Sequence, residues 1–346
     1  MNNYQRASKR GFKVFLCVLL VCIFSFFSLS KTSIAASQSV NKLIEGAKKE
    51  GQINYYASMS VEESRIIITE FEKKYPFLKV KMLRLNSGQL LTKTLTEYRM
   101  NKNSADVLQT VEFSMQILMQ KGILGQYVSK ENGFYPKESK EEGYWICAYC
   151  NPYVVAYSSK LVKPQDIPKA YDDLLNPRWK GKMIMESEKV DWFAGMLEIM
   201  GREKGLKFMR ELSKQDIIKR TGHTLIGTLV VAGEAELQIN TPNTVTDRIK
   251  KKGAPLDWVA LGPVPGIMIG IGIASKPPHP NAAKLYVDFM LSKKSQTFLR
   301  DLGRTSLRSD VVRPPSTKDL NIVVVNPALA NNMNEYMTLF REIFLK

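Results

Sequence analysis

Apolar residues recur along the chain with two alternating periods, one typical of strands and one typical of helices. Residues 53–57 form a short apolar run, and the segment after them places Ile67, Ile68 and Phe71 on one helical face. Residues 78–82 alternate apolar and lysine side chains, as a half-buried strand does. This alternation of strands and helices predicts an α/β sheet protein.

The same periodicities continue to the end of the chain. Further strands are expected at residues 105–109, 235–240 and 258–261, and helices at 89–100, 115–121, 192–200, 206–212, 225–230, 244–252, 282–290 and 328–344. Two extended runs, 144–158 and 266–275, separate two α/β regions. We therefore expect two lobes joined by two crossing strands: residues 37–152 with 267–346 in the first lobe, and 153–266 in the second.

The first 36 residues have the composition of a secretory signal peptide. Four basic residues and no acidic ones precede an apolar run over 14–29, and small residues follow at Ser33, Ala35 and Ala36. We expect cleavage after Ala35 or Ala36. The alternative is an uncleaved membrane anchor, because the apolar run approaches the length of a bilayer span. A lipoprotein attached at Cys22 is disfavoured because Val21 before it is large.

Composition and charge narrow the possible functions. The chain has 346 residues, of which 44% are hydrophobic and 24% charged, so it is neither disordered nor low in complexity. The formal charge is +17, and cleavage after Ala36 removes five positive charges and leaves +12. A basic body favours anionic partners, although net charge says little about any one pocket.

Four candidate motifs are better explained by structure than by chemistry. The Cys147-x-x-Cys150 motif lies in an extended pattern, where residues three apart face opposite sides, so we expect two separate thiols. The lysine run 250–252 suits a helix end, His279 suits a helix start, and Gly270-Ile271-Gly272 opens no helix. Neither nucleic-acid nor dinucleotide binding is therefore expected, and two histidines are too few for a zinc site.

Two sequence blocks carry a family resemblance. Residues 167–183 read IPKAYDDLLNPRWKGKM, and residues 277–312 begin PPHPNAAKLYVDFMLSKKSQ. Both blocks resemble the ferric-ion-binding branch of the periplasmic solute-binding proteins that serve ABC importers. The resemblance implies a two-lobe type II periplasmic-binding fold, each lobe a mixed sheet flanked by helices and joined by two hinge strands. Such proteins close over their solute by a hinge motion.

Ligands of open α/β sheets bind beyond the carboxyl ends of the strands. We therefore expect the solute to contact side chains that follow the predicted strands, and the turn at Ser87 to act as a helix N-terminus that holds an anion. The candidate ligand-binding residues are Ser58, Met59, Ser87, Gly88, Gln109, Thr110, Ser187, His223, Asn240 and Thr241.

The sequence departs from the branch where iron would bind. The branch holds iron with two adjacent tyrosines after the corresponding strand of the second lobe, whereas residues 237–243 contain none. Fe(III) prefers anionic oxygen ligands, and Asn and Thr supply only neutral ones. Glu112 lies one or two positions beyond the expected ligand position, and Tyr56, Tyr149 and Tyr153 fall in strand patterns. Direct iron binding is therefore in doubt, and no cofactor or structural metal is expected.

The sequence favours a monomeric, periplasmic solute-binding protein without enzymatic activity that delivers a small solute to an inner-membrane ABC permease. The solute is either an organic anion such as a phosphonate or phosphate ester, or a ferric ion held by non-standard ligands. A sensor anchored by residues 14–29 is a second alternative. An exported enzyme has little support, since no nucleophile elbow, metal triad or paired carboxylates occur in a motif.

Overall fold

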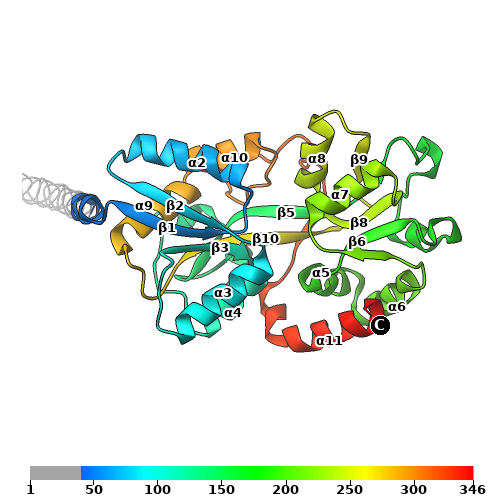
Figure 1. The fold of residues 1–346 in the computed structure, drawn as a ribbon, viewed down its shortest axis with the longest axis horizontal. Helices are drawn as coiled ribbons and strands as arrows, with labels where there is room; N and C mark the ends of the chain where they lie inside the picture. The colour runs from blue at the N-terminus through cyan, green and yellow to red at the C-terminus, as the bar shows by residue number, and fades with distance from the viewer. Residues whose placement is uncertain (1–39, 346) are drawn as a thin grey trace, which may run out of the picture.

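The computed structural model describes residues 40–345, so the predicted signal peptide and its cleavage site lie outside the described residues. A helix covers residues 40–50, and the first lobe then forms around a central sheet (Figure 1). The sheet consists of β1 (Gln52–Ala57), β2 (Lys79–Arg84), β3 (Val107–Val111), β5 (Trp145–Ser158) and β10 (Val264–Ile273). The strand β1 pairs in parallel with β2 and β3, while β10 lies antiparallel between β3 and β5.

Helices cover both faces of this sheet. They are α2 (Val61–Lys74), α3 (Ser87–Arg99), α4 (Glu112–Gln120), α9 (Pro280–Leu291) and α10 (Lys293–Asp301). The start of α2 is fixed by Ser60, whose hydroxyl accepts a hydrogen bond from the backbone N–H of Glu63, and Ile67 and Phe71 are buried on its inner face. Phe71 packs edge-on against Tyr286 of α9, with ring centroids 5.0 Å apart. The helices predicted near Ile67 and at 89–100, 115–121 and 282–290 are therefore confirmed as α2, α3, α4 and α9, whereas α10 was not predicted.

The second lobe repeats the arrangement with a smaller sheet. Its strands are β6 (Met183–Glu186), β7 (Ile218–Arg220), β8 (Leu237–Pro242) and β9 (Leu256–Val259), and its helices are α5 (Val190–Met200), α6 (Arg202–Ser213), α7 (His223–Ala232) and α8 (Asn243–Lys251). The strand β6 pairs in parallel with β7 and β8. Each of α5, α7 and α8 begins within four residues of a strand end, so the helix N-termini gather at one edge of the sheet.

One strand belongs to both lobes. The first half of β5 pairs with β10, as Pro152 does with Gly266, and the second half pairs with β8 and β9 from Tyr153 onward. Figure 1 shows β5 and β10 running between the lobes. The two extended runs expected from sequence are therefore confirmed as crossing strands.

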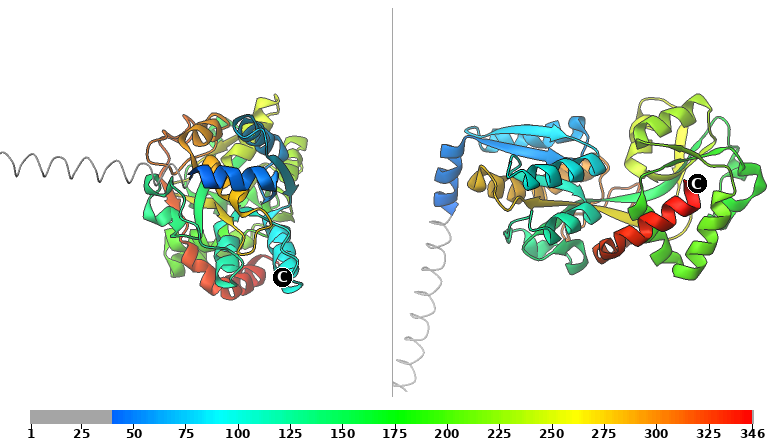
Figure 2. Two further views of the ribbon diagram at one scale, coloured as in Figure 1. Left: turned by 90° about the vertical axis from the view of Figure 1, so that its left-hand side faces the viewer. Right: turned by 60° about the horizontal axis from the view of Figure 1, so that its bottom comes forward.

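The C-terminal segment crosses between the lobes as well. After β11 (Ile322–Val324) and a short 3₁₀ helix, Pro327–Asn332, the helix α11 (Met333–Phe344) packs on α5 and α6 (Figure 2). The ring of Phe340 meets that of Phe193 on α5 edge-on at 5.7 Å. We expected residues 267–346 to belong wholly to the first lobe; that is wrong for α11, because its aromatic face is buried against the second.

Several predicted boundaries differ from the structure. The helix α4 begins three residues before the predicted one, β8 extends to Pro242, and the single helix expected over 328–344 is divided into a 3₁₀ turn and α11. Several elements were not predicted from the periodicity: the helix at residues 40–50, α10, β4 (Lys140–Glu141), β7, β11, and 3₁₀ turns at Asn132–Phe134, Lys137–Ser139, Pro164–Asp166, Tyr171–Leu175 and Pro177–Trp179. Within residues 40–345, no helix combines the length and apolarity that a bilayer crossing requires.

The two cysteines occupy one region of the core. Cys147 and Cys150 are free thiols, as expected, and both are fully buried in β5. The expectation that they face opposite sides is wrong, because the pairing of β5 with β10 shifts register between Ile269 and Gly270. This irregularity skips Ala148, so both sulfur atoms pack in the same apolar cluster.

The glycines of β10 allow close packing. A Cβ atom on Gly270 would lie 2.8 Å from the indole of Trp145, and one on Gly272 would lie 2.5 Å from the carbonyl oxygen of Tyr144. These glycines therefore let β10 lie directly against β5. This agrees with the prediction that Gly270-Ile271-Gly272 has a structural role and does not bind a dinucleotide.

His279 does not cap α9 through its side chain. Its Nδ1 lies 2.8 Å from a carboxylate oxygen of the buried Asp106. The cap comes instead from Glu50, whose carboxylate accepts hydrogen bonds from the backbone N–H groups of Asn281 and Ala282 at 3.1 and 2.7 Å. The predicted capping role of His279 is thus wrong, because an acidic residue of the N-terminal helix occupies that position.

Candidate functional site

A cavity of about 390 Å³ lies between the lobes. The first lobe contributes residues at the start of α3 and α4, the second contributes residues at the start of α5, and α11 forms a further wall. The lining residues are Ser87, Gly88, Leu91, Val111, Phe113, Ser114, Ser187, Glu188, Lys189, Val190, Asp191, Met333, Met337, Phe340, Arg341 and Leu345. Because it opens at helix N-termini of both lobes, the cavity lies where a closing two-lobe protein would hold a solute.

Ser87 is the first residue of α3, and its hydroxyl does not cap that helix. The cap is Asn86, whose side chain accepts a hydrogen bond from the backbone N–H of Gln89 at 2.8 Å. The side-chain oxygen of Gln89 in turn accepts a hydrogen bond from the backbone N–H of Asn86, which completes a capping box. The Ser87 hydroxyl and the backbone N–H groups of Ser87 and Gly88 therefore remain available at the cavity.

The second lobe places a charged pair at the cavity wall. The Lys189 ammonium donates a hydrogen bond to Asp191 at 2.7 Å, and the two side chains are only 12% and 6% exposed. Burial alone would lower the pKa of Lys189, but the charge of Asp191 and the nearby Tyr153 oxygen raise it above its usual value. The ammonium thus stays charged and is held in place beside the cavity.

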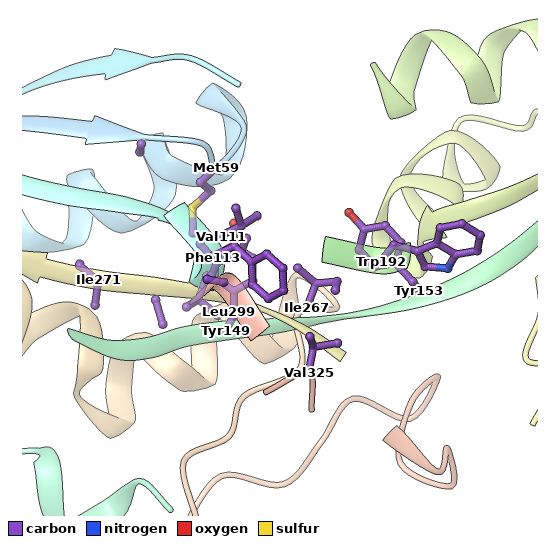
Figure 3. Packing of buried hydrophobic residues seen from close by; sticks show 14 of the residues in the cluster. Met59, Val111, Phe113, Tyr149, Tyr153, Trp192, Ile267, Ile271, Leu299 and Val325 are labelled. Carbon is purple, nitrogen blue, oxygen red and sulfur yellow. The ribbon is translucent and has the colours of Figure 1, made fainter. Parts of the chain in front are cut away.

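His223 and Tyr153 extend this polar cluster toward the hinge strand. The Tyr153 hydroxyl lies 3.2 Å from Nε2 of His223, and the Lys189 ammonium lies 5.3 Å from the Tyr153 ring. Burial, and then the charge of Lys189, hold the pKa of His223 well below its usual value, so the imidazole is neutral. Figure 3 shows Tyr153 and Trp192 on the second lobe's side of the hinge, facing Phe113 and Ile267.

Glu112 is the first residue of α4 and is fully buried. Among the described residues, neither of its carboxylate oxygens has a hydrogen-bond partner. Burial, followed by repulsion from Asp191 of the other lobe, raises its pKa well above the usual value. The raised pKa favours the protonated carboxyl, which is a poorer ligand for a hard cation than a carboxylate.

The structure gathers three of the predicted site residues at one cavity, namely Ser87, Gly88 and Ser187. Ser58 and His223 lie at the ends of neighbouring elements without lining it. The other predicted residues are buried inside the lobes: Met59, Gln109, Thr110, Asn240 and Thr241.

Two of these buried residues are occupied by structural hydrogen bonds. The Asn240 amide accepts from the backbone N–H of Glu186 at 2.8 Å and donates to its carbonyl at 3.1 Å, so it links β8 to β6. The Gln109 side-chain oxygen accepts a hydrogen bond from the hydroxyl of Tyr55. Met59 packs beside Val111, as Figure 3 shows.

The wall formed by α11 was not predicted from the sequence. Its cavity residues Met333, Met337, Phe340, Arg341 and Leu345 follow helical spacing, so the stripe itself was visible in the sequence. What the sequence did not reveal was that this stripe faces the space between the lobes.

The donor set of the cleft differs from a preformed iron site. No cluster of three or more His, Cys, Asp or Glu side chains suited to a metal ion occurs within residues 40–345. Burial raises the pKa of the Tyr153 hydroxyl, which disfavours the phenolate that Fe(III) requires. The positively charged Lys189 ammonium also lies beside the oxygens of Asp191 and Tyr153, where it would repel a ferric ion.

This architecture defines a class: two α/β lobes on crossing strands, with a cavity at their facing helix N-termini, form a type II periplasmic-binding fold. The chain belongs to the bacterial extracellular solute-binding protein family, whose model matches residues 102–336. The resemblance read from the two sequence blocks is thereby confirmed.

Individual relatives are distant. Iron uptake protein A1 of Synechocystis sp. is 23% identical over 271 residues, covering 72% of this chain and 73% of the relative. The probable ABC transporter periplasmic-binding protein y4fP of Sinorhizobium fredii is 23% identical over 262 residues, covering 71% and 72%. The periplasmic binding protein AfuA of Actinobacillus pleuropneumoniae, solved with fructose-6-phosphate bound, superposes with a TM-score of 0.73 at 20% identity, covering 84% of this chain and 97% of AfuA.

Proposed function

We propose that this protein is the periplasmic solute-binding component of an ABC importer and that its solute is a small organic anion. The observation that carries the proposal is the interlobe cavity of about 390 Å³, into which Ser87 of one lobe and Ser187 of the other both face. A solute that touches both lobes stabilises the closed state, which is the state presented to a permease. The similarity to a probable ABC transporter periplasmic-binding protein supports this partner.

An anion is supported by the groups at the cavity. The first turn of α3 offers backbone N–H groups, and Lys189 and Arg341 bring positive charge. Asp191 and Glu188 at the same cavity offset these charges, so the anion is held by helix ends and hydroxyls rather than by an excess of charge. We propose that the solute is carried unchanged, by a monomer, and that nucleic acid is not a partner.

The experiment is native mass spectrometry of protein purified from periplasm without refolding, followed by a thermal-shift screen of anions and metals. A retained organic acid, and a melting temperature raised by the same compound, would support the proposal. Protein that retains nothing and is not stabilised by any organic anion would contradict it.

Ferric iron is a second candidate solute, favoured by the name of the Synechocystis relative. Asp191 and Tyr153 would provide oxygen ligands only if Lys189 moved away from both. Addition of Fe(III) with carbonate or phosphate should then produce a visible charge-transfer band, whereas a colourless protein would exclude this candidate. A membrane-anchored sensor is distinguished by N-terminal sequencing, because only a cleaved protein begins after Ala35 or Ala36.

A further inference from the structure

The helix α11 presents an apolar stripe to the interlobe cavity. Met333, Met337 and Phe340 are spaced so that they share one face of the helix and line the cavity, and Leu345, just past the helix end, lines it too. Leu345 is 46% exposed, so this face is not fully covered by the protein itself. An apolar surface that borders a cavity is suited to an apolar part of a ligand.

This wall is held firmly in place. Phe340 and Phe344 pack edge-on against Phe193 of α5, with ring centroids 5.7 and 6.4 Å away. The turn before α11 is tied to the first lobe, where the amide of Gln120 donates to Asn331 at 2.5 Å. The stripe is therefore positioned by both lobes rather than hanging from a loose terminus.

The opposite wall is apolar too. Leu91 of α3, Val111 at the end of β3 and Phe113 of α4 face the same cavity from the first lobe. The polar lining residues come mainly from the starts of α3, α4 and α5, with Arg341 on α11; they are Ser87, Ser114, Ser187, Glu188, Lys189, Asp191 and Arg341. The cavity thus combines two apolar walls with polar side chains, among which Lys189 and Arg341 could pair with an acidic group.

We infer that the solute is an organic acid with an apolar body, and that α11 selects it by packing against that body. This inference rests on the proposed function and specifies the class of solute. A cavity of about 390 Å³ is large enough for a substituted aromatic or branched aliphatic acid. Methionine side chains accept varied shapes, so we expect selection for apolar bulk more than for one outline.

The test compares two pairs of probes that share a head group and differ in the body: phenylphosphonate against methylphosphonate, and benzoate against acetate. Affinities are measured by isothermal titration calorimetry. The protein should bind the larger member of at least one pair at least about tenfold more tightly. Equal affinities within both pairs, or no binding of any probe, would overturn the inference.

Matched variants locate the effect on α11. Met337→Asn should reduce the preference to within about threefold, because it places an amide on the apolar wall. Thr338→Asn, one position along on the exposed side of the helix, should retain the preference. A preference that survives Met337→Asn in a variant with unchanged circular dichroism would also overturn the inference. Native mass spectrometry separates the outcomes: a retained organic anion without an apolar body, such as a sugar phosphate, would support the proposed function while rejecting this solute class.

Discussion

Arg304 and Glu63 form a buried ion pair in which the guanidinium donates two hydrogen bonds to the carboxylate, of 2.9 and 2.7 Å. The same guanidinium also donates to Asn151 of β5 at 2.6 Å and to Thr244 of α8 at 3.0 Å. It lies 4.6 Å from the Tyr149 ring centroid. One side chain thus joins the first lobe, the crossing strand and the second lobe.

Replacement of Arg304 by alanine should destabilise the protein strongly. It would leave Glu63 buried without its partner, and breaking a buried pair in this way costs about 3–5 kcal/mol. Urea unfolding at pH 7 measures the loss. The double variant Glu63→Ala with Arg304→Ala should lose clearly less than the sum of the two single variants. Additive losses would show that the two side chains do not act as a pair.

Thr244→Val should loosen the contact between the lobes with a smaller effect on stability. The substitution preserves shape but removes the second lobe's acceptor for Arg304, at a cost of about 1 kcal/mol. We expect the solute-free protein to become more open, with a larger radius of gyration in small-angle X-ray scattering. Thr246→Val is the matched control, because the buried Thr246 hydroxyl has no partner among the described residues. Equal expansion of both variants would contradict the role of Thr244.

Asn240→Ala and Ser87→Ala should separate structural from binding residues. The first leaves a buried N–H and a carbonyl of Glu186 without partners and should cost about 2–4 kcal/mol in urea unfolding. The second should change stability by less than about 0.5 kcal/mol, because the Ser87 hydroxyl caps nothing, yet it should weaken solute binding. A stable Asn240→Ala protein would show that the link between β8 and β6 is dispensable.

Asn240 and Ser87 show which features of the site could be predicted from the sequence. Ser87 follows the predicted strand at residues 78–82, and Asn240 is the last residue of the predicted strand 235–240. Strand ends do gather at the interlobe edge, so the position of the cleft was predictable. Whether a side chain at a strand end points into the cleft or back into the sheet depends on the exact end of the strand. The strand β8 continues to Pro242, two residues past the predicted end, and Asn240 therefore lies inside the sheet.

The fold followed from sequence more completely than the site did. Local periodicity determines helices and strands, and it produced the α/β alternation and the crossing strands. Contacts between distant segments have no such local signal. The irregular pairing of β5 with β10 beside Ala148 turns Cys147 to the same side of the sheet as Cys150. The helix α11 packs on α5 and α6, which lie more than a hundred residues earlier in the chain. Each depends on which partner surface is available in the folded chain.

His223 should make the folded protein sensitive to mild acid. Its folded pKa lies well below the usual value because of burial and then the charge of Lys189. Below about pH 6.5 the unfolded chain therefore binds a proton that the folded chain does not. The free energy of unfolding then decreases as the pH is lowered. His223→Gln should lose about 1 kcal/mol less than the parent between pH 7.5 and 5.5. Identical pH dependence in both proteins, measured by urea unfolding, would contradict this assignment.

Cys147 and Cys150 should be unreactive as long as the protein is folded. Both thiols are fully buried, and burial raises the pKa of each, so the nucleophilic thiolate is almost absent at pH 8. In protein that begins at residue 37, Ellman's reagent should modify neither thiol over an hour under native conditions and both in 6 M guanidinium chloride. An added surface thiol, Thr338→Cys, should react within minutes and confirms that the reagent is active. Loss of both thiol signals in guanidinium would reveal a disulfide and contradict the two free thiols, whereas rapid native labelling would show that β5 opens to solvent.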